Sequence, residues 1–284
     1  MENYLLYQAY GKKEVKLECK FSLLHLLSKN FQHNLCPVIY TDDITFFENI
    51  LKDFPSKIIR GITTEEIQEW RGEINFLHRV KIKILMDFLD NHAGNLLYCD
   101  TDTYFLQSPN TIFSDLEKGE FYMHILEGRI NKKTDIQFKK WEKFLMNHME
   151  IVNVSNHSEI NQIEMWNAGV IGFNSKYKEL LKAVLDLTDK IYPLFPKHIA
   201  EQFSFSYIFQ RKVNIRSASN YIFHFWYLKE FGHYLEKIFE QNSENDYFLQ
   251  IKKIRLLPEE LLKEKLDYEG RSKLFRLLRG KWKL

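Results

Sequence analysis

Two aspartates separated by one residue, Asp100 and Asp102, have the residue types and spacing that suggest chemistry most directly. They follow the run Asn95–Cys99, whose apolar centre predicts a short buried strand. On an ideal strand the two carboxylates would point to opposite faces, but at a strand end that turns into a loop they can converge on one cation. Mg²⁺ and Mn²⁺ prefer oxygen ligands and leave other positions to phosphates and water. The pair therefore predicts a divalent-cation site that can neutralise a diphosphate.

The elements before the aspartates must bring them to a common edge. Strands and helices alternate along the chain, which predicts an α/β fold with a mostly parallel sheet flanked by helices. In such sheets ligands bind beyond the carboxyl ends of the strands, where Asp100 and Asp102 are expected. The expected strands cover residues 4–10, 37–40, 57–59, 95–99, 120–127 and 213–226, and 166–173 is expected as a Gly-punctuated strand pair or bend. The expected helices cover 14–27, 44–51, 76–89, 138–146, 175–191 and 198–210.

Length and charge limit the class of protein. The 284 residues fit one catalytic domain over 1–235 and a charged, helical extension over 236–284. The formal net charge is +2, so no field of the whole protein favours nucleic acid as a partner. Three scattered cysteines, no signal-peptide pattern and no long apolar run predict a cytoplasmic protein.

The segment from Asn95 to Phe105 resembles the metal-binding segment of GT-A-fold glycosyltransferases. With the motifs that follow, the chain is most similar to the retaining glycogenin and lipopolysaccharide-galactosyltransferase type, over roughly residues 4–230 by motif order. The resemblance implies a GT-A (Rossmann-like) domain that uses Mn²⁺ or Mg²⁺. It also implies a nucleotide-sugar donor, with a UDP-sugar favoured, a glycan or lipid-linked hydroxyl acceptor, and retention at the anomeric carbon.

Residues on both sides of the aspartates match further parts of the family pattern. Arg79 and Lys83, one turn apart on the preceding helix, match basic residues that contact the donor; a surface stripe held by i,i+4 pairing is the alternative. The segment Trp166-Asn167-Ala-Gly169-Val resembles the family's sugar and acceptor segment. An Asn can bond sugar hydroxyls, Gly allows close backbone approach, and Trp166 can offer an apolar platform. A Gly-rich turn between core strands is the alternative.

Two later motifs complete the predicted catalytic set. Glu201 and Gln202 match the position of the family's acidic and amide residues, which can stabilise a cationic transition state or act as a nucleophile. A solvated first helical turn is the competing interpretation. His224 matches the C-terminal histidine that supplies a third metal ligand, with His233 as the fallback, and Lys229 is predicted to reach the diphosphate.

The nucleotide site is predicted from the first two strands. Ala9 and Tyr10 end the first strand, where the family seats the base, and Tyr10 can stack on it. Asp42 or Asp43, after the second strand, can accept hydrogen bonds from base or ribose. Thr101, between the two aspartates, is expected to contact the donor as well.

The last fourteen residues, 271–284, contain six basic residues and no acidic one. Their pattern predicts an amphipathic basic helix for peripheral contact with an anionic membrane, and docking against the catalytic domain or a partner is the alternative. For the whole chain, two other functions stay open. One is a haloacid-dehalogenase-like phosphatase that uses Asp100 and Asp102, and the other is an inactive GT-A-like binding module.

Overall fold

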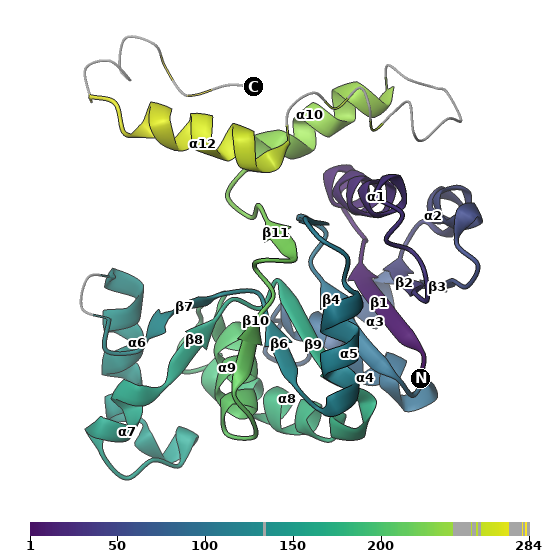
Figure 1. The fold of residues 1–284 in the computed structure, drawn as a ribbon. Coiled ribbons are helices and arrows are strands. Elements are labelled where there is room, and N and C mark those ends of the chain that lie inside the picture. The colour runs from purple at the N-terminus through teal and green to yellow at the C-terminus, as the bar shows by residue number, and fades with distance from the viewer. Residues whose placement is uncertain are drawn as a thin grey trace.

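The computed structural model describes residues 1–132, 135–240 and 257–272, together with residues 251, 254, 280 and 282. Its centre is a seven-stranded sheet of β1 (Asn3–Gln8), β2 (Cys36–Thr41), β3 (Ile58–Gly61), β4 (Asn95–Cys99), β6 (Phe121–Met123), β9 (Val170–Asn174) and β10 (Ile215–Ser217). The strand order is β10-β6-β9-β4-β1-β2-β3, and each neighbouring pair is parallel except the two pairs that β9 forms (Figure 1). The predicted mostly parallel α/β sheet is confirmed.

Helices cover both faces of this sheet (Figure 1). The described α-helices are α1 (Lys13–Ser28), α2 (Ile44–Ile50), α3 (Thr64–Arg71), α4 (Arg79–Asn91), α5 (Asn110–Lys118), α6 (Ile136–Asn147), α7 (His157–Gln162), α8 (Leu180–Ile191), α9 (Ala200–Gln210), α10 (Lys229–Glu240) and α12 (Pro258–Glu269). Short 3-10 turns lie at Leu51–Asp53, Met149–Val152 and Ser175–Tyr177.

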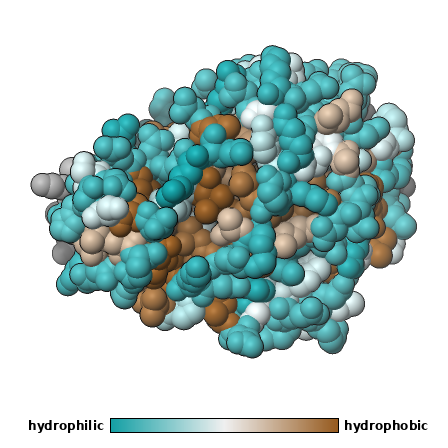
Figure 2. Space-filling model, turned by 90° about the horizontal axis from the view of Figure 1, so that it is seen from below, coloured by the Kyte–Doolittle hydropathy of each residue, from teal (hydrophilic) through white to brown (hydrophobic). Residues whose placement is uncertain are grey.

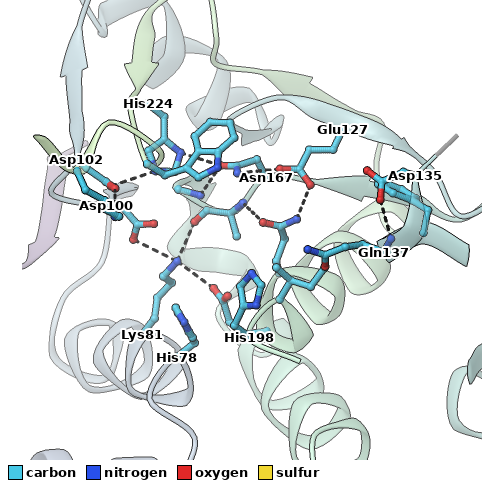
Figure 3. A pocket seen from close by; sticks show the side chains of 18 residues that line it. His78, Lys81, Asp100, Asp102, Glu127, Asp135, Gln137, Asn167, His198 and His224 are labelled. Carbon is cyan, nitrogen blue, oxygen red and sulfur yellow. Dashed lines mark hydrogen bonds and ion pairs between the residues drawn. The ribbon is translucent and has the colours of Figure 1, made fainter. Parts of the chain in front are cut away.

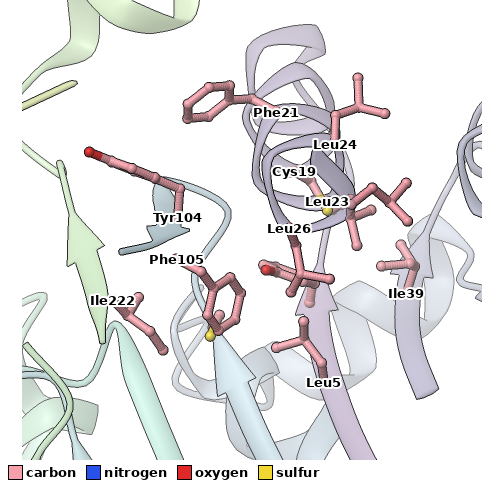
Figure 4. Packing of buried hydrophobic residues seen from close by; sticks show 14 of the residues in the cluster. Leu5, Cys19, Phe21, Leu23, Leu24, Leu26, Ile39, Tyr104, Phe105 and Ile222 are labelled. Carbon is pink, nitrogen blue, oxygen red and sulfur yellow. The ribbon is translucent and has the colours of Figure 1, made fainter. Parts of the chain in front are cut away.

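Alternation along the strands divides the core between the two faces. Leu5 of β1 and Ile39 of β2 face α1, α2 and α5, whereas Tyr4 and Leu6 face α4, α8 and α9. Figure 4 shows Leu23 of α1 directed toward the side of the sheet that carries Leu5 and Ile39. Strands buried on both faces read as continuous apolar runs, which is why β4 was recognisable in the sequence. Its central place delivers the residues after Cys99 to the middle of the sheet edge.

Two small sheets complete the edge above the carboxyl ends of the strands. One pairs β5 (Thr103–Phe105) with β11 (Ile222–His224), and the other pairs β7 (Leu126–Arg129) with β8 (Glu164–Trp166); both are antiparallel. The ranges 120–127 and 213–226, each expected as one strand, are therefore divided: each contributes one strand to the main sheet and one to a small sheet. The sequence pattern does not show where the chain leaves one sheet and joins another.

The C-terminal part lies above α1 (Figure 1). Phe231, Leu235 and Phe239 of α10 join the core cluster of α1, so the boundary expected at 235/236 falls inside a packed helix. The basic helix predicted for 271–284 lies largely outside the described residues. No helix in the described part of the chain is both long and apolar enough to cross a membrane. The face in Figure 2 is mostly hydrophilic, with hydrophobic side chains gathered in a few patches.

Candidate functional site

A cavity of about 480 Å³ opens at the carboxyl edge of the sheet. It lies where β4 ends, β9 begins and α9 starts, which is the position that the rule for parallel sheets favours for ligands. Figure 3 shows Asp100, Asp102 and His224 on one side of the cavity, Asp135 and Gln137 on the other, and Asn167, Glu127 and Lys81 between them.

Asp100, Asp102 and His224 come together on one wall of the cavity. Asp100 and Asp102 flank the turn after β4, and the pairing of β11 with β5 sets His224 opposite Thr103. One potential ligand atom from each residue lies within 4.8 Å of the others. His224 Nε2 is 3.1 Å from Asp102 Oδ1, and the Phe225 N–H donates to the Asp102 carbonyl at 2.9 Å. The geometry brings together the three residues that the sequence proposed as metal ligands.

The His224 ring is held from its other side. Its Nδ1 lies 2.9 Å from Asn167 Oδ1, which also accepts the Gly169 N–H at 3.0 Å. A Cβ added to Gly169 would lie 2.1 Å from His224 Cε1, so only glycine leaves room for the ring. His124 packs edge-on at 5.2 Å, and burial lowers the pKa of His124 to about 4. Asn167 and Gly169 thus position His224.

This arrangement fits a divalent cation. A histidine that donates from Nδ1 to Asn167 carries its lone pair on Nε2, which faces a carboxylate oxygen of Asp102 at 3.1 Å. Two acceptors at that distance repel unless a proton or a cation lies between them. Burial raises the pKa of Asp102, but with a proton on Nε2 the charge and hydrogen bond of His224, together with the charge of Lys229, outweigh burial and hold it below its ordinary value. Carboxylate oxygens, an imidazole nitrogen and a fixed tautomer are the donor set that Mn²⁺ accepts.

Lys81 joins this wall to the start of α9. Its buried ammonium lies 3.2 Å from Asp100 Oδ1 and 3.1 Å from Glu201 Oε1, and donates to the Ala168 carbonyl at 3.0 Å. Burial alone lowers the pKa of Lys81, but the charges of Asp100 and Glu201 raise it above its ordinary value. A lysine charged in this way fixes both carboxylates. Sequence reasoning chose Lys83 by its distance from Asp100 along the chain and so missed Lys81, two residues earlier on the same helix.

Glu201 and Gln202 lie on the first turn of α9, and both are buried and line the cavity. Burial raises the pKa of Glu201 to about 7, although Lys81 acts in the opposite direction. Gln202 donates to Glu127 Oε2 at 2.9 Å, and the other oxygen of Glu127 accepts from Asn167 at 3.0 Å. Glu127, which the sequence did not single out, therefore connects the amide beside Glu201 with the residue that holds His224. Because both side chains are buried, the alternative interpretation of a solvated first helical turn is wrong.

The structure places Arg79 and Lys83 away from this cavity. Arg79 forms a two-pronged pair with Asp189 at 2.8 and 3.1 Å and donates to the Trp70 carbonyl. Lys83 lines a separate cavity beside Arg79, not the one that holds Asp100. The prediction was therefore wrong by two residues: the basic residue of α4 that reaches the site is Lys81, not Lys83.

Trp166 does not form the platform that was expected. It is 7% exposed, belongs to the core and donates from Nε1 to Glu164 at 3.1 Å. Trp166 ends β8, where it pairs with Leu126 of β7. Successive side chains of a strand point to opposite faces, and the face that Trp166 takes is the one that packs on the core. Trp226, two residues after His224, lines the cavity instead, with His78 and His198. An aromatic after the histidine was visible in the sequence, but no spacing rule identified it.

The residues predicted for the nucleotide follow β1 and β2 at the same sheet edge, but none of them lines the cavity. Ala9 is buried and its N–H donates to the Tyr40 carbonyl at 2.8 Å. Burial raises the pKa of the half-buried Tyr10 to about 12. Asp42 accepts the Gly11 N–H at 3.0 Å and pairs with Lys16 at 2.9 Å.

The neighbour of Asp42, Asp43, accepts the Phe46 N–H at 3.2 Å and begins α2, which gives it a structural role.

Three further predicted residues surround Asp102. Thr101 donates to buried Glu18 of α1 at 3.3 Å, and burial raises the pKa of Glu18 to about 8. Lys229 lines the cavity, with its ammonium 3.8 Å from Asp102 Oδ2 and 78% of the side chain exposed. His233 lies 3.9 Å from Glu14 and outside the metal set, so His224 rather than the fallback meets the aspartates.

No family model matches this chain, and no curated protein sequence matches it. Solved structures do. The galactosyltransferase LgtC in complex with donor and acceptor sugar analogues aligns over 92% of this chain and 99% of its own, with a TM-score of 0.53 and 11% identity. An active-site mutant of LgtC aligns over 76% of this chain and 73% of its own, with a TM-score of 0.50 and 11% identity. Mouse xyloside xylosyltransferase 1 aligns over 76% and 85% of the two chains, with a TM-score of 0.48 and 9% identity. The chain therefore has the fold of GT-A glycosyltransferases, including that of LgtC, as the sequence resemblance predicted.

Proposed function

We propose that this chain is a metal-dependent glycosyltransferase that moves a sugar from a nucleotide-diphosphate donor to a hydroxyl acceptor with retention. The observation that carries the proposal is one cavity in which Asp100, Asp102 and His224 form one wall and Lys81 ties Asp100 to Glu201. A glycosyl transfer needs charge neutralised at the leaving diphosphate and a negative group near the anomeric carbon. The two groups of residues supply these side by side in one cavity, with the Lys81 ammonium between Asp100 and Glu201.

Asp100, Asp102 and His224 would hold Mn²⁺ or Mg²⁺, which supplies Lewis-acid stabilisation of the departing diphosphate. Lys81 holds the Asp100 carboxylate in place, and exposed Lys229 adds positive charge where the diphosphate enters. Asn167 fixes the His224 tautomer so that Nε2 keeps its lone pair for the cation.

Glu201 and Gln202 are the groups proposed beneath the sugar. The carboxylate of Glu201 stabilises the oxocarbenium-like transition state, and the amide of Gln202, oriented by Glu127, contacts sugar hydroxyls. The acceptor hydroxyl then attacks on the face that the diphosphate leaves and gives its proton to the departing diphosphate oxygen, which gives retention. UDP is the favoured nucleotide, because the nucleotide residues around Ala9, Tyr10 and Asp42 follow the pattern of the family that the sequence resembles.

The phosphatase alternative is not favoured. In a haloacid-dehalogenase-like enzyme the first aspartate acts as a nucleophile, whereas Asp100 Oδ1 here accepts from Tyr98 at 2.5 Å and pairs with Lys81. Both contacts hold the Asp100 carboxylate in place and make Oδ1 a weaker nucleophile. The GT-A-like fold also opposes that alternative.

The test is a screen of donor hydrolysis. Purified protein with Mn²⁺ is incubated with UDP- and GDP-sugars, and the released nucleoside diphosphate is measured. We expect release from one donor, at least 100-fold slower release from Asp102→Asn, and unchanged release from the control Asp90→Asn, which alters an exposed aspartate at the end of α4. Failure to release a diphosphate from any donor, with and without sugar acceptors, would favour the inactive binding module. An NMR time course that shows the opposite anomer would remove the retaining assignment alone.

A further inference from the structure

We call the side of the main cavity formed by Asp100, Asp102 and His224 the metal wall. A second pocket adjoins the cavity on the side away from it. It has a volume of about 210 Å³ and is lined by Gln137, Lys140, Trp141, Phe195, Lys197 and His198. We call it the lysine pocket. Gln137 and His198 line both this pocket and the main cavity, so the two are adjacent. Its volume is below the range of complete ligand sites, about 300–1,000 Å³, and fits one substituent of a larger ligand.

The charges of the two compartments are opposite. The main cavity has five carboxylate residues in its lining: Asp100, Asp102, Glu127, Asp135 and Glu201. The lysine pocket contains two lysines, and none of the described residues that line it is acidic. Within the described chain, no carboxylate lies within ion-pair distance of Lys140 or Lys197. An anionic substituent is therefore attracted to the lysine pocket, where no carboxylate of the lining opposes it.

The pocket has fixed walls and free donors. The Lys197 N–H donates to the Phe195 carbonyl at 2.7 Å, and its ammonium lies 5.5 Å from the centre of the Phe195 ring. Trp141 is 1% exposed and is stacked on Phe203 at 4.5 Å. Among the described residues, its buried indole N–H has no hydrogen-bond partner. The two ammonium groups, the Gln137 amide and His198 all donate, so the pocket favours a ligand that accepts hydrogen bonds.

We propose that the lysine pocket binds an anionic group, a carboxylate or a phosphate, on the sugar acceptor. This inference rests on the proposed glycosyltransferase function and defines the acceptor as an acidic glycan. The acceptor hydroxyl lies in the main cavity near Gln202, and its acidic substituent passes Gln137 and His198 to reach Lys140 and Lys197. Figure 3 shows Gln137 across the cavity from Asp100 and Asp102, so the acidic group stays far from the metal wall. The donor diphosphate and the acceptor anion then occupy opposite ends of the site.

The test compares neutral and acidic sugars. The full-length protein with Mg²⁺ and UDP is titrated by ligand-observed NMR with glucose, glucuronate and glucose 6-phosphate, and with the matching galactose series. Inorganic phosphate is titrated separately. The variant Lys140→Gln/Lys197→Gln removes both ammonium groups. The matched control Lys139→Gln/Lys143→Gln removes two exposed lysines of α6 that do not line the pocket.

We expect the wild-type protein to bind a uronate or a 6-phosphate at least tenfold more tightly than the neutral sugar. The pocket variant loses this preference and the control variant keeps it. Preference for the uronate identifies a carboxylate, and preference for the 6-phosphate over inorganic phosphate identifies a phosphorylated sugar. Equal binding of neutral and acidic sugars overturns the proposal, and so does an equal loss in both variants, which would indicate a general effect of charge.

Release of UDP from UDP-sugars is measured on the same proteins. The pocket variant should hydrolyse the donor at the wild-type rate, because Lys140 and Lys197 contact neither Asp100 nor Glu201. Absence of release from the wild-type protein would reject the transferase, while loss of acid preference in the pocket variant would still assign the anion site. The two hypotheses can therefore fail separately.

Discussion

Substitution of Gly169 by alanine tests the proposed metal wall without altering any ligand atom. A Cβ on Gly169 would lie 2.1 Å from His224 Cε1 and 2.2 Å from Nδ1, whereas ordinary contact begins at 3.4 Å. The ring must therefore withdraw by about 1.3 Å, the difference between 3.4 and 2.1 Å. Metal–ligand distances tolerate changes of only about 0.2 Å. His224 cannot retreat and also keep its bond of 2.9 Å to Asn167.

The expected result is a loss of Mn²⁺ affinity of about 10- to 100-fold, the range found when groups that orient a ligand are removed. Overpacking should also lower the free energy of unfolding by about 1–3 kcal/mol. Calorimetric titration with Mn²⁺, with and without UDP, measures the first effect, and urea denaturation measures the second. Gly270→Ala, whose new Cβ would come no closer than 3.3 Å to another atom, is the control.

A double-mutant cycle separates a clash from a general disturbance. If Gly169 acts by admitting the imidazole, then adding Gly169→Ala to His224→Ala should weaken Mn²⁺ binding no further, because the ring that it displaces is gone. Additive losses would show that Gly169→Ala disturbs the site by another route. Wild-type Mn²⁺ affinity in Gly169→Ala alone would refute the reasoning, since a ligand displaced by more than 1 Å cannot stay bound.

Three further predictions follow from the same contacts. Asp102→Asn should abolish the rise in melting temperature that Mn²⁺ gives, whereas Asp90→Asn should keep it in the same thermal assay. Lys81→Met leaves two carboxylates without their buried partner and should lower the free energy of unfolding by about 3–5 kcal/mol in urea, while Lys83→Met should change it by less than about 0.5 kcal/mol. Because burial raises the pKa of Glu201 to about 7 and the charged form is the one that stabilises the sugar cation, donor hydrolysis at saturating Mn²⁺ should rise with pH through about 7. Glu201→Gln should remove that rise from the pH–rate profile, and an unchanged profile would assign it to another group.

The sheet and the positions of the aspartates could be predicted because they depend on local pattern. A strand buried on both faces is apolar throughout, and β4 is short, so its end and the residues after it are defined in the sequence. Lys81 could not be predicted in this way. A lysine among apolar residues is stable only through partners, and its partners Asp100 and Glu201 lie 19 and 120 residues away in the chain.

Trp166 and Glu127 illustrate the other limit, which is the face of a strand. The side on which each residue lies depends on the register between β7 and β8, and a bulge interrupts that register between Leu126 and Gly128. Glu127 lies at this bulge and turns toward Gln202, while Trp166 turns toward the core. β7 has four residues, too few for the sequence to show a shift of one residue in the alternation.

The small sheet of β5 and β11 decides whether the metal wall exists at all. His224 reaches Asp102 because it pairs with Thr103, the residue after Asp102, and the Phe225 N–H donates to the Asp102 carbonyl. A slip of one residue would turn His224 to the opposite face and bring Phe223 or Phe225 to the aspartates. The aromatic neighbours oppose this slip: Phe225 is 1% exposed and packs against Phe21 and Phe231 in the α1 cluster. Burial of the residues beside the histidine therefore fixes the register of β11, and through the register the third ligand. The same packing attaches α10 to α1, so a helix outside the sheet contributes to the geometry of the cation site.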